Sequence, residues 1–269
     1  MPGIPLPLQR SFGETQRRDN WWLAPAAVLF GLSAFIVYST WAAFQANNYT
    51  VDGTSYLSPF YSPELFHPKG HDTGHSWFGE LPSWWPAWLP YSPAFLILWA
   101  PAGFRFTCYY YRGAYYKAFW ADPPGCAVGE PRKGYIGESN WPLRFQNIHR
   151  YFMYFAVLFI GMLAYDAIKA FIFADGIGIG IGTVVLCVNV VLLGGYTLGC
   201  HSLRHILGGR KDCITESPTC QSMYRKCSAL NSRHALWAWM SLCSVGFSDV
   251  YVRLCSMNVW HDYHFIIMK

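Results

Sequence analysis

Cysteine and histidine side chains lie at the ends of long apolar stretches in this 269-residue chain, at Cys108, His149, Cys200 and His234. Thiolates and imidazoles bind transition metals and iron–sulfur centres. Two histidines on different helices could ligate a haem b. Two cysteines with two histidines could instead hold a Rieske-type [2Fe–2S] centre or a structural zinc ion. His201 and His205 follow Cys200 and are alternative imidazole ligands.

The elements that carry these residues are predicted to be membrane-spanning helices. Hydrophobic residues make up 53% of the chain and charged residues only 13%, against roughly 25% charged in soluble domains. Residues 20–51 and 176–203 contain no Asp, Glu, Lys or Arg, and about 20 apolar residues are enough to cross a bilayer. The sequence predicts an all-α integral membrane protein with five transmembrane helices, at about 21–45, 93–111, 150–173, 178–205 and 234–254. These form a single domain, 20–254, between an N-terminal tail, 1–19, and a C-terminal tail, 255–269.

The distribution of Lys and Arg predicts the orientation of the bundle. Most of the 20 basic residues fall in the N-terminal tail and in the segments after the second and fourth predicted spans. The segment 52–80 has Lys69 alone against four acidic residues. The positive-inside rule therefore places the N-terminus in the cytoplasm and the C-terminal tail outside. The net charge of +5 follows from this topology, and no nucleic-acid partner is expected.

In this orientation the four residues share one level just under the cytoplasmic face. Cys108 ends the second span and His149 opens the third, while Cys200 closes the fourth and His234 opens the fifth. Any one of them alone could be a small buried thiol or an interfacial imidazole. Because ionisable groups inside spans are costly and usually functional, four at one depth on four helices favour a bound cofactor.

Other groups of residues carry weaker signals. The Pro- and Gly-rich outer loop is expected to be an ordinary solvated loop without a metal, despite three histidines at a spacing of four: His67, His71 and His75. The run Gly176–Gly182 is expected to let helices approach closely. Three cysteines repeat every seven residues and would share one helix stripe as free thiols in a reducing compartment: Cys213, Cys220 and Cys227.

Several motifs together resemble one family. They are Leu57-Ser-Pro-Phe with Tyr61-Ser62-Pro63, Thr107-Cys108-Tyr-Tyr-Tyr-Arg112 with Ala114-Tyr115-Tyr116, Cys126-Ala127-Val128, Asn147-Ile148-His149-Arg150-Tyr151-Phe152, and Cys200-His201-Ser202 with Arg204-His205. From about Asp19 to Tyr251 the chain resembles the five-span membrane-anchor subunit, the cytochrome b-like C subunit, of actinobacterial, mycobacterial-type succinate dehydrogenase.

The resemblance implies a role in respiratory complex II of the bacterial cytoplasmic membrane. A flavoprotein subunit oxidises succinate, an iron–sulfur subunit carries the electrons, and the anchor passes them to quinone without independent activity of its own. Many such anchors use haem b, but the branch that this chain resembles is associated with a membrane-embedded Rieske-type [2Fe–2S] cluster. Its implied ligands are Cys108, His149, Cys200 and His234, with His201 and His205 as second choices. The family often has a second cysteine where this chain has Leu203, so that position supplies no ligand.

Quinone reduction consumes protons, so its site should offer polar donors near the inner face, and a cationic Arg would stabilise negative charge on the quinone oxygen. The candidates are Tyr109, Tyr110, Arg112, Arg150, His201, Ser202 and His205. The arginines could instead be topology and headgroup anchors only. Two other interpretations stay open: a haem b anchor ligated by pairs from the same histidines, and a cofactor-free anchor or transporter in which the shared level is a coincidence.

Overall fold

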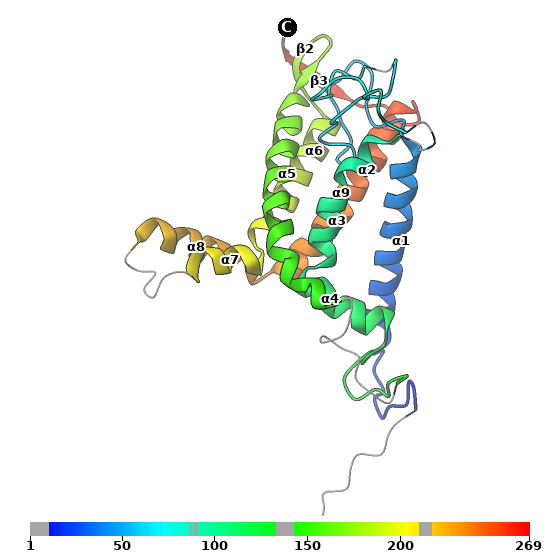
Figure 1. Cartoon of the computed structure of the whole chain (residues 1–269), viewed down its shortest axis with the longest axis vertical. Coiled ribbons are helices and arrows are strands. Elements are labelled where there is room, and N and C mark those ends of the chain that lie inside the picture. The colour runs from blue at the N-terminus through cyan, green and yellow to red at the C-terminus, as the bar shows by residue number, and fades with distance from the viewer. Residues whose placement is uncertain (1–10, 71, 87, 89–90, 133–142, 210–216) are drawn as a thin grey trace, which may run out of the picture. The chain divides into compact units, whose positions relative to one another are not determined.

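The computed structural model describes residues 11–70, 72–86, 88, 91–132, 143–209 and 217–269 (Figure 1). The chain divides into two compact units. The first comprises residues up to 36 and residues 105–149, and the second comprises residues 37–104 and 150–269. Three helices contain residues of both units: α1 (Leu23–Gln45), α3 (Trp99–Phe106) and α5 (His149–Lys169). The boundary falls inside α1 and α3 and directly after the first residue of α5.

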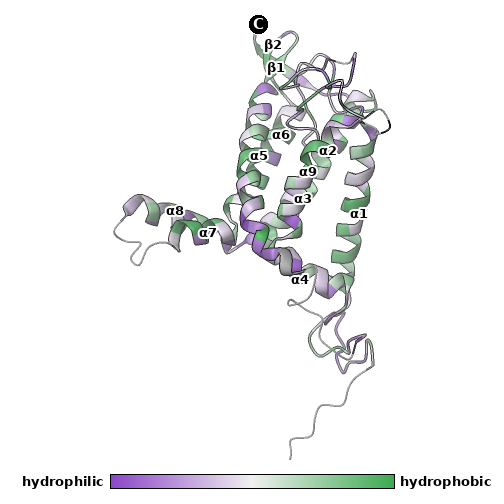
Figure 2. Cartoon of the chain, viewed as in Figure 1, coloured by the Kyte–Doolittle hydropathy of each residue, from purple (hydrophilic) through white to green (hydrophobic). Residues whose placement is uncertain are grey.

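Four helices among the described residues are long and apolar enough to cross a membrane: Leu23–Gln45, Gln146–Lys169, Ile181–Leu198 and His234–Ser256. They correspond to α1, α5 with the 3-10 turn η2 (Leu143–Ile148) before it, α6 (Ile181–Leu198) and α9 (His234–Ser256). In the second unit α6 packs along α9, and most of α6 is hydrophobic in Figure 2. Four of the five predicted spans are therefore confirmed as helices of spanning length.

The second predicted span, 93–111, is not one continuous helix. It is divided into α2 (Pro93–Ile97), α3 and α4 (Tyr109–Ala114), and a π-helical turn, η1 (Tyr115–Phe119), follows. Pro101 has no amide hydrogen to donate to the carbonyl of Ile97, which accounts for the first division. Leu98 between α2 and α3 keeps helical dihedrals, φ −65° and ψ −20°. Residues 93–106 thus form a kinked helical run, and the chain leaves it before Cys108.

Two other predicted spans are too long. The fourth, 178–205, ends as a helix at Leu198, and residues from His201 belong to a separate helix, α7 (His201–Gly208). The third, 150–173, ends at Lys169, because residues 172–173 enter a strand. A further helix, α8 (Pro218–Asn231), lies between α7 and α9. We call α7 and α8 together the arm.

The protein is mostly helical but not all-α, because a small antiparallel sheet lies beyond the last residues of α5 and α9. Its strand order is β1 (Ile172–Phe173), β2 (Gly176–Gly180), β3 (His264–Met268). The glycine run, predicted to let helices approach closely, instead forms β2 and the first two residues of α6, and the C-terminal tail supplies β3. A Cβ at Gly178 would lie 2.5 Å from the carbonyl oxygen of Phe265, so glycine is needed for the close approach of these two strands.

We call this end of the second unit the sheet end and the opposite end, where α6 is followed by α7, the arm end. The sheet end contains a buried loop, residues 56–64, in which every residue is buried. An irregular segment is normally exposed, because its backbone groups need partners. Here the hydroxyl groups of the loop bond carboxylates from other elements, with Ser58 bonding Asp249 of α9 and Ser62 bonding Asp166 of α5.

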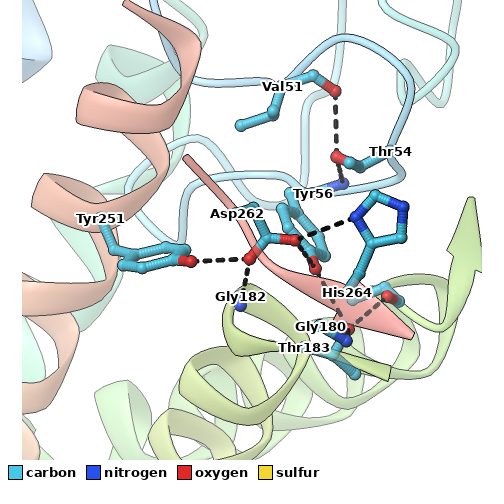
Figure 3. Close-up of polar contacts among 10 residues, drawn as sticks. Val51, Thr54, Tyr56, Gly180, Gly182, Thr183, Tyr251, Asp262 and His264 are labelled. Carbon is cyan, nitrogen blue, oxygen red and sulfur yellow. Dashed lines mark hydrogen bonds and ion pairs between the residues drawn. The ribbon is translucent and has the colours of Figure 1, made fainter. Parts of the chain in front are cut away.

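Asp262 ties the C-terminal segment to the start of α6 (Figure 3). Its carboxylate accepts hydrogen bonds from the hydroxyls of Tyr56 at 2.8 Å and Tyr251 at 2.6 Å, and from the amide of Gly182 at 2.9 Å. A carboxylate at a helix N-terminus is also favoured by the helix dipole. The ring of His264 lies 3.9 Å away. These contacts hold the segment after α9 against α6.

The segment 52–80 is therefore only in part the solvated loop that its composition predicts, because residues 56–64 are buried whereas Lys69 and Asp72 are exposed. Glu64 at the end of the buried loop accepts a hydrogen bond from Tyr49 at 2.9 Å and another from Thr73, and burial raises the pKa of its carboxyl. Among the predicted histidines, burial lowers the pKa of His75 to about 4. His71 lies outside the described residues. Hydropathy alone did not reveal this loop, because its polar side chains are satisfied inside the protein.

In the first unit the N-terminal tail is held against residues 125–129. The amide of Gly13 donates to the carbonyl of Gly129 at 3.0 Å, and Thr15 donates its hydroxyl hydrogen to the carbonyl of Ala127 at 2.9 Å. Arg17 donates to the carbonyl of Cys126 at 3.0 Å. The described part of the predicted tail is thus packed on the loop that follows η1.

Candidate functional site

Cys108 lies in the first unit at a break between two helices. It is 2% exposed and is the N-cap of α4, with φ −65° and ψ 134°. Its amide donates to the carbonyl of Arg105 at 3.2 Å, and its own carbonyl accepts from the amide of Arg112 at 2.9 Å. The helix therefore stops and restarts around one buried cysteine, whose thiol lies at the positive end of the new helix.

His149 lies in the same unit and contacts Thr107, the residue directly before Cys108. The Thr107 hydroxyl and Nδ1 of His149 are 2.9 Å apart, and both residues are buried. When Nδ1–H donates to this hydroxyl, Nε2 keeps the lone pair that a metal ligand needs. Thr107 was not among the residues predicted from the sequence, although its position directly before Cys108 could have suggested it.

Cys200 in the second unit has the same backbone geometry as Cys108. It is 1% exposed and is the N-cap of α7, with φ −67° and ψ 138°. Its amide donates to the carbonyl of Thr197 at 3.2 Å, and its carbonyl accepts from the amide of Arg204 at 3.1 Å. The amide of Ser202 donates to Sγ of Cys200 at 3.3 Å. Amide donors at a helix N-terminus favour the thiolate form of cysteine.

His234 at the first turn of α9 lies beside the end of α6. Its ring stacks on the ring of Tyr196, with centroids 5.0 Å apart and planes 20° apart. Asn231, at the end of α8, donates to the carbonyl of Gly199 at 2.8 Å and fixes this junction directly before Cys200. A Cβ at Gly195 would lie 2.6 Å from the indole ring of Trp237, so glycine is required for this close packing of α6 and α9.

Each unit therefore contains one buried cysteine at a helix break and one histidine at the start of a long helix. Among the residues that the structure describes, no three or more His, Cys, Asp or Glu side chains form a group that could hold a metal ion. The four candidate ligands divide between the units, with Cys108 and His149 in the first and Cys200 and His234 in the second. The sequence predicted their common depth but not the helix breaks.

The predicted quinone residues also divide between the units. In the first unit, Arg112 is buried, bonds Gln146 and stacks over Tyr109, with its guanidinium carbon 4.8 Å from the ring centroid. Tyr109 is 61% exposed, and the ring of Tyr110 lies edge-on to Tyr111 with centroids 5.5 Å apart.

In the second unit the remaining quinone candidates cluster around α7. His201 and His205 are exposed on this helix, and Ser202 is half-buried. The guanidinium of Arg150 lies 3.5 Å from Nδ1 of His205, which brings the start of α5 to the same surface. This group can offer both hydrogen-bond donors and positive charge.

Two of the three cysteines at a spacing of seven face α7 from α8. The thiol of Cys220 donates to the carbonyl of Leu207 at 2.8 Å, and that of Cys227 to the carbonyl of Cys200 at 3.8 Å. Burial raises the pKa of the Cys227 thiol, which favours the neutral thiol. Cys213 lies outside the described residues.

The fold and these residues define a membrane-embedded, mostly helical protein with cysteine and histidine pairs where its helices begin and end. The chain belongs to the family of the actinobacterial succinate dehydrogenase subunit SdhC, whose model matches residues 23–258. It is also similar to a chain of the Mycobacterium smegmatis Sdh1 complex in the apo form, with 42% identity and a TM-score of 0.85, over 98% of this chain and 99% of that chain. No relative was found among curated proteins. The chain is thus a membrane-anchor subunit of succinate dehydrogenase.

Proposed function

We propose that this anchor passes electrons from succinate oxidation to a membrane quinone through an embedded Rieske-type [2Fe–2S] centre. Cys108, His149, Cys200 and His234 would hold the centre. The observation that carries this proposal is the repeated geometry of the two cysteines, each buried at a helix break with matching dihedrals. At both breaks a buried thiol lies where the next helix begins, so two thiols are presented at helix N-termini.

The donor set fits this group chemically. A Rieske-type centre needs two thiolates and two imidazoles, and the two pairs supply that number. The Ser202 amide at the start of α7 donates to Sγ of Cys200 and favours its thiolate, while the Thr107 hydroxyl can fix the tautomer of His149. When bound, such a centre accepts and donates one electron at a potential raised by its imidazole ligands.

The chain's own residues would bind the quinone and supply protons. Arg112 with Tyr109 and Tyr110, and Arg150 with His201, Ser202 and His205, are the candidate contacts. Arg150 and His205 lie 3.5 Å apart on an exposed surface. The positive charge of Arg150 would stabilise negative charge that develops on a quinone oxygen, and the imidazoles can transfer protons.

We further propose five crossings in a bacterial cytoplasmic membrane, with the kinked run 93–106 as the second. The N-terminus and the arm end would face the cytoplasm, and the sheet end would face outside. The support is the concentration of Lys and Arg on the proposed cytoplasmic side. Basic segments on that side suit docking of the flavoprotein and iron–sulfur subunits, which this chain would join as a subunit without activity of its own.

The test is an optical and EPR spectrum of the purified, reduced complex. We expect a Rieske-type signal without a haem Soret band, which disappears in Cys108→Ser and in Cys200→Ser. Cys243→Ser is the matched control, because Cys243 is exposed on α9, and it should keep the signal. A b-type haem band that survives both substitutions would overturn the ligand set. Absence of both signals from the wild-type complex would overturn the electron-transfer role.

A further inference from the structure

The arm is attached to membrane-spanning helices at both of its ends. Helix α6 ends at Leu198 and α7 begins at His201, while α8 ends at Asn231 and α9 begins at His234. Linkers this short leave little freedom in depth, because a residue spans at most about 3.6 Å. In Figure 1 the arm extends sideways from this end, across the direction of α5 and α6. This direction is the one that a membrane surface would take at the end of spanning helices.

In the described part of the arm, every Asp, Glu, Lys or Arg position is basic. Helices α7 and α8 contain no Asp or Glu, and Arg204, Arg225, Lys226 and the adjoining Arg233 are basic. The connecting residues 210–216 lie outside the described residues and carry two basic and two acidic residues in the sequence. Arg225, Lys226 and Arg233 are all exposed.

Apolar and basic side chains occur together on this surface. Met223 is 50% exposed beside Arg225 and Lys226. The guanidinium of Arg204 lies over the ring of Tyr224, 5.1 Å from its centroid. In Figure 2 both helices of the arm show hydrophilic and hydrophobic residues. Long basic side chains with aromatic and apolar neighbours are typical of helices that lie at the headgroup level.

We propose that the arm is an interfacial element that binds anionic phospholipid headgroups on its side of the bilayer. Arg225, Lys226 and Arg233 make the electrostatic contacts, and Met223 enters the acyl boundary. A lipid surface fits better than a soluble protein because the helix ends fix the depth of the arm and its exposed charges are uniformly basic. Each basic residue at an anionic membrane surface raises the affinity about fivefold.

Hydrogen–deuterium exchange on the intact complex in nanodiscs tests this proposal. One set of nanodiscs contains phosphatidylcholine alone, and the other contains equal parts of phosphatidylcholine and phosphatidylglycerol. We expect the amides of α8 to exchange more slowly with phosphatidylglycerol, and added salt to remove the difference. In Arg225→Gln with Lys226→Gln, the ratio of α8 amide exchange rates between the two lipid compositions should fall by about fivefold for each charge removed.

Two further variants separate charge from folding. Lys69→Gln with Lys269→Gln removes the same charge from exposed residues elsewhere and should keep the effect of phosphatidylglycerol. Arg225→Lys with Lys226→Arg should also keep the effect of phosphatidylglycerol. Anionic headgroups attract either basic side chain, so the interaction depends on charge and not on side-chain shape. Protection of α8 that is equal in both lipids and insensitive to salt would overturn the proposal and assign the arm to a protein partner.

Discussion

The two ends of the second unit use polar side chains in opposite ways. At the sheet end, carboxylates are buried and bonded to hydroxyl groups, as for Asp249, Asp166 and Asp262. At the arm end, Cys200 and His234 are held in place mainly by backbone amides and by ring stacking. One end is a satisfied polar network that holds elements together. The other presents sulfur and nitrogen atoms that can ligate a metal.

The difference teaches that burial of a polar group does not by itself identify a functional site. A buried carboxylate is costly unless it is paired, so the sheet end should dominate stability. The thiol and imidazole groups of the arm end are less costly to bury as neutral groups, so their substitution should affect redox properties more than folding. Each prediction below tests this division.

The largest effect is expected at Asp249. It is fully buried, forms an ion pair with Arg253 at 3.5 Å, and accepts from Tyr38 at 2.5 Å and from Ser58. Asp249→Leu leaves a buried cation without its counter-charge and should cost about 3–5 kcal/mol. Thermal unfolding of the complex in detergent measures the loss. Asp249→Leu with Arg253→Leu should recover part of it, and a double variant as unstable as the single would contradict the role of the ion pair.

Asp262 should come next. Asp262→Ala removes the acceptor for Tyr56, Tyr251 and the Gly182 amide, and the loss should be about 3 kcal/mol, since bonds to a charged group contribute roughly 1.5–3 kcal/mol each and do not add fully. Hydrogen exchange of β3 should increase in the same variant. His264→Ala is the comparison, because its ring lies 3.9 Å from the carboxylate, beyond hydrogen-bond distance, and stacks on Phe173; its loss should cost about 1 kcal/mol, less than that of Asp262. Unchanged exchange of β3 would show that Asp262 does not hold the C-terminal segment.

The sequence predicted the spanning helices but not the helix breaks or the buried loop. Long uncharged runs predicted the spanning helices, because the bilayer requires their length and composition. A common depth for Cys108 and Cys200 follows from the same runs and stays a prediction. The helix breaks do not follow from them, because they depend on single backbone dihedrals at ordinary residues. Nor does the buried loop, because Ser58 and Ser62 meet their carboxylates only after distant elements pack together.

The free energy of unfolding should depend on pH through protonation of His75 at the sheet end. Burial, with a smaller contribution from the charge of Lys169, lowers the pKa of the folded ring to about 4 from 6.5. The unfolded chain therefore takes up a proton first, and stability is lost as the pH falls from 6.5 toward 4, by at most about 3 kcal/mol. His75→Phe should remove this part of the difference between unfolding at pH 7 and at pH 5. An identical pH profile in both proteins would show that His75 does not titrate in this way.

The smallest effect is expected from one methyl group at the arm end. Gly195→Ala places a Cβ 2.6 Å from the indole of Trp237, and overpacking of this kind costs about 1–3 kcal/mol. Because Tyr196 beside it stacks on His234, the same variant should shift the EPR signal of a centre ligated by His234. Gly194→Ala is the matched control on the adjacent residue, since nothing lies within 4 Å of the added Cβ. It should leave the signal unchanged and slightly stabilise α6, because alanine is favoured over glycine in a helix by about 0.5–1 kcal/mol. A signal shift of equal size in both variants would mean that helix α6 as a whole, and not the contact with Trp237, controls the position of His234.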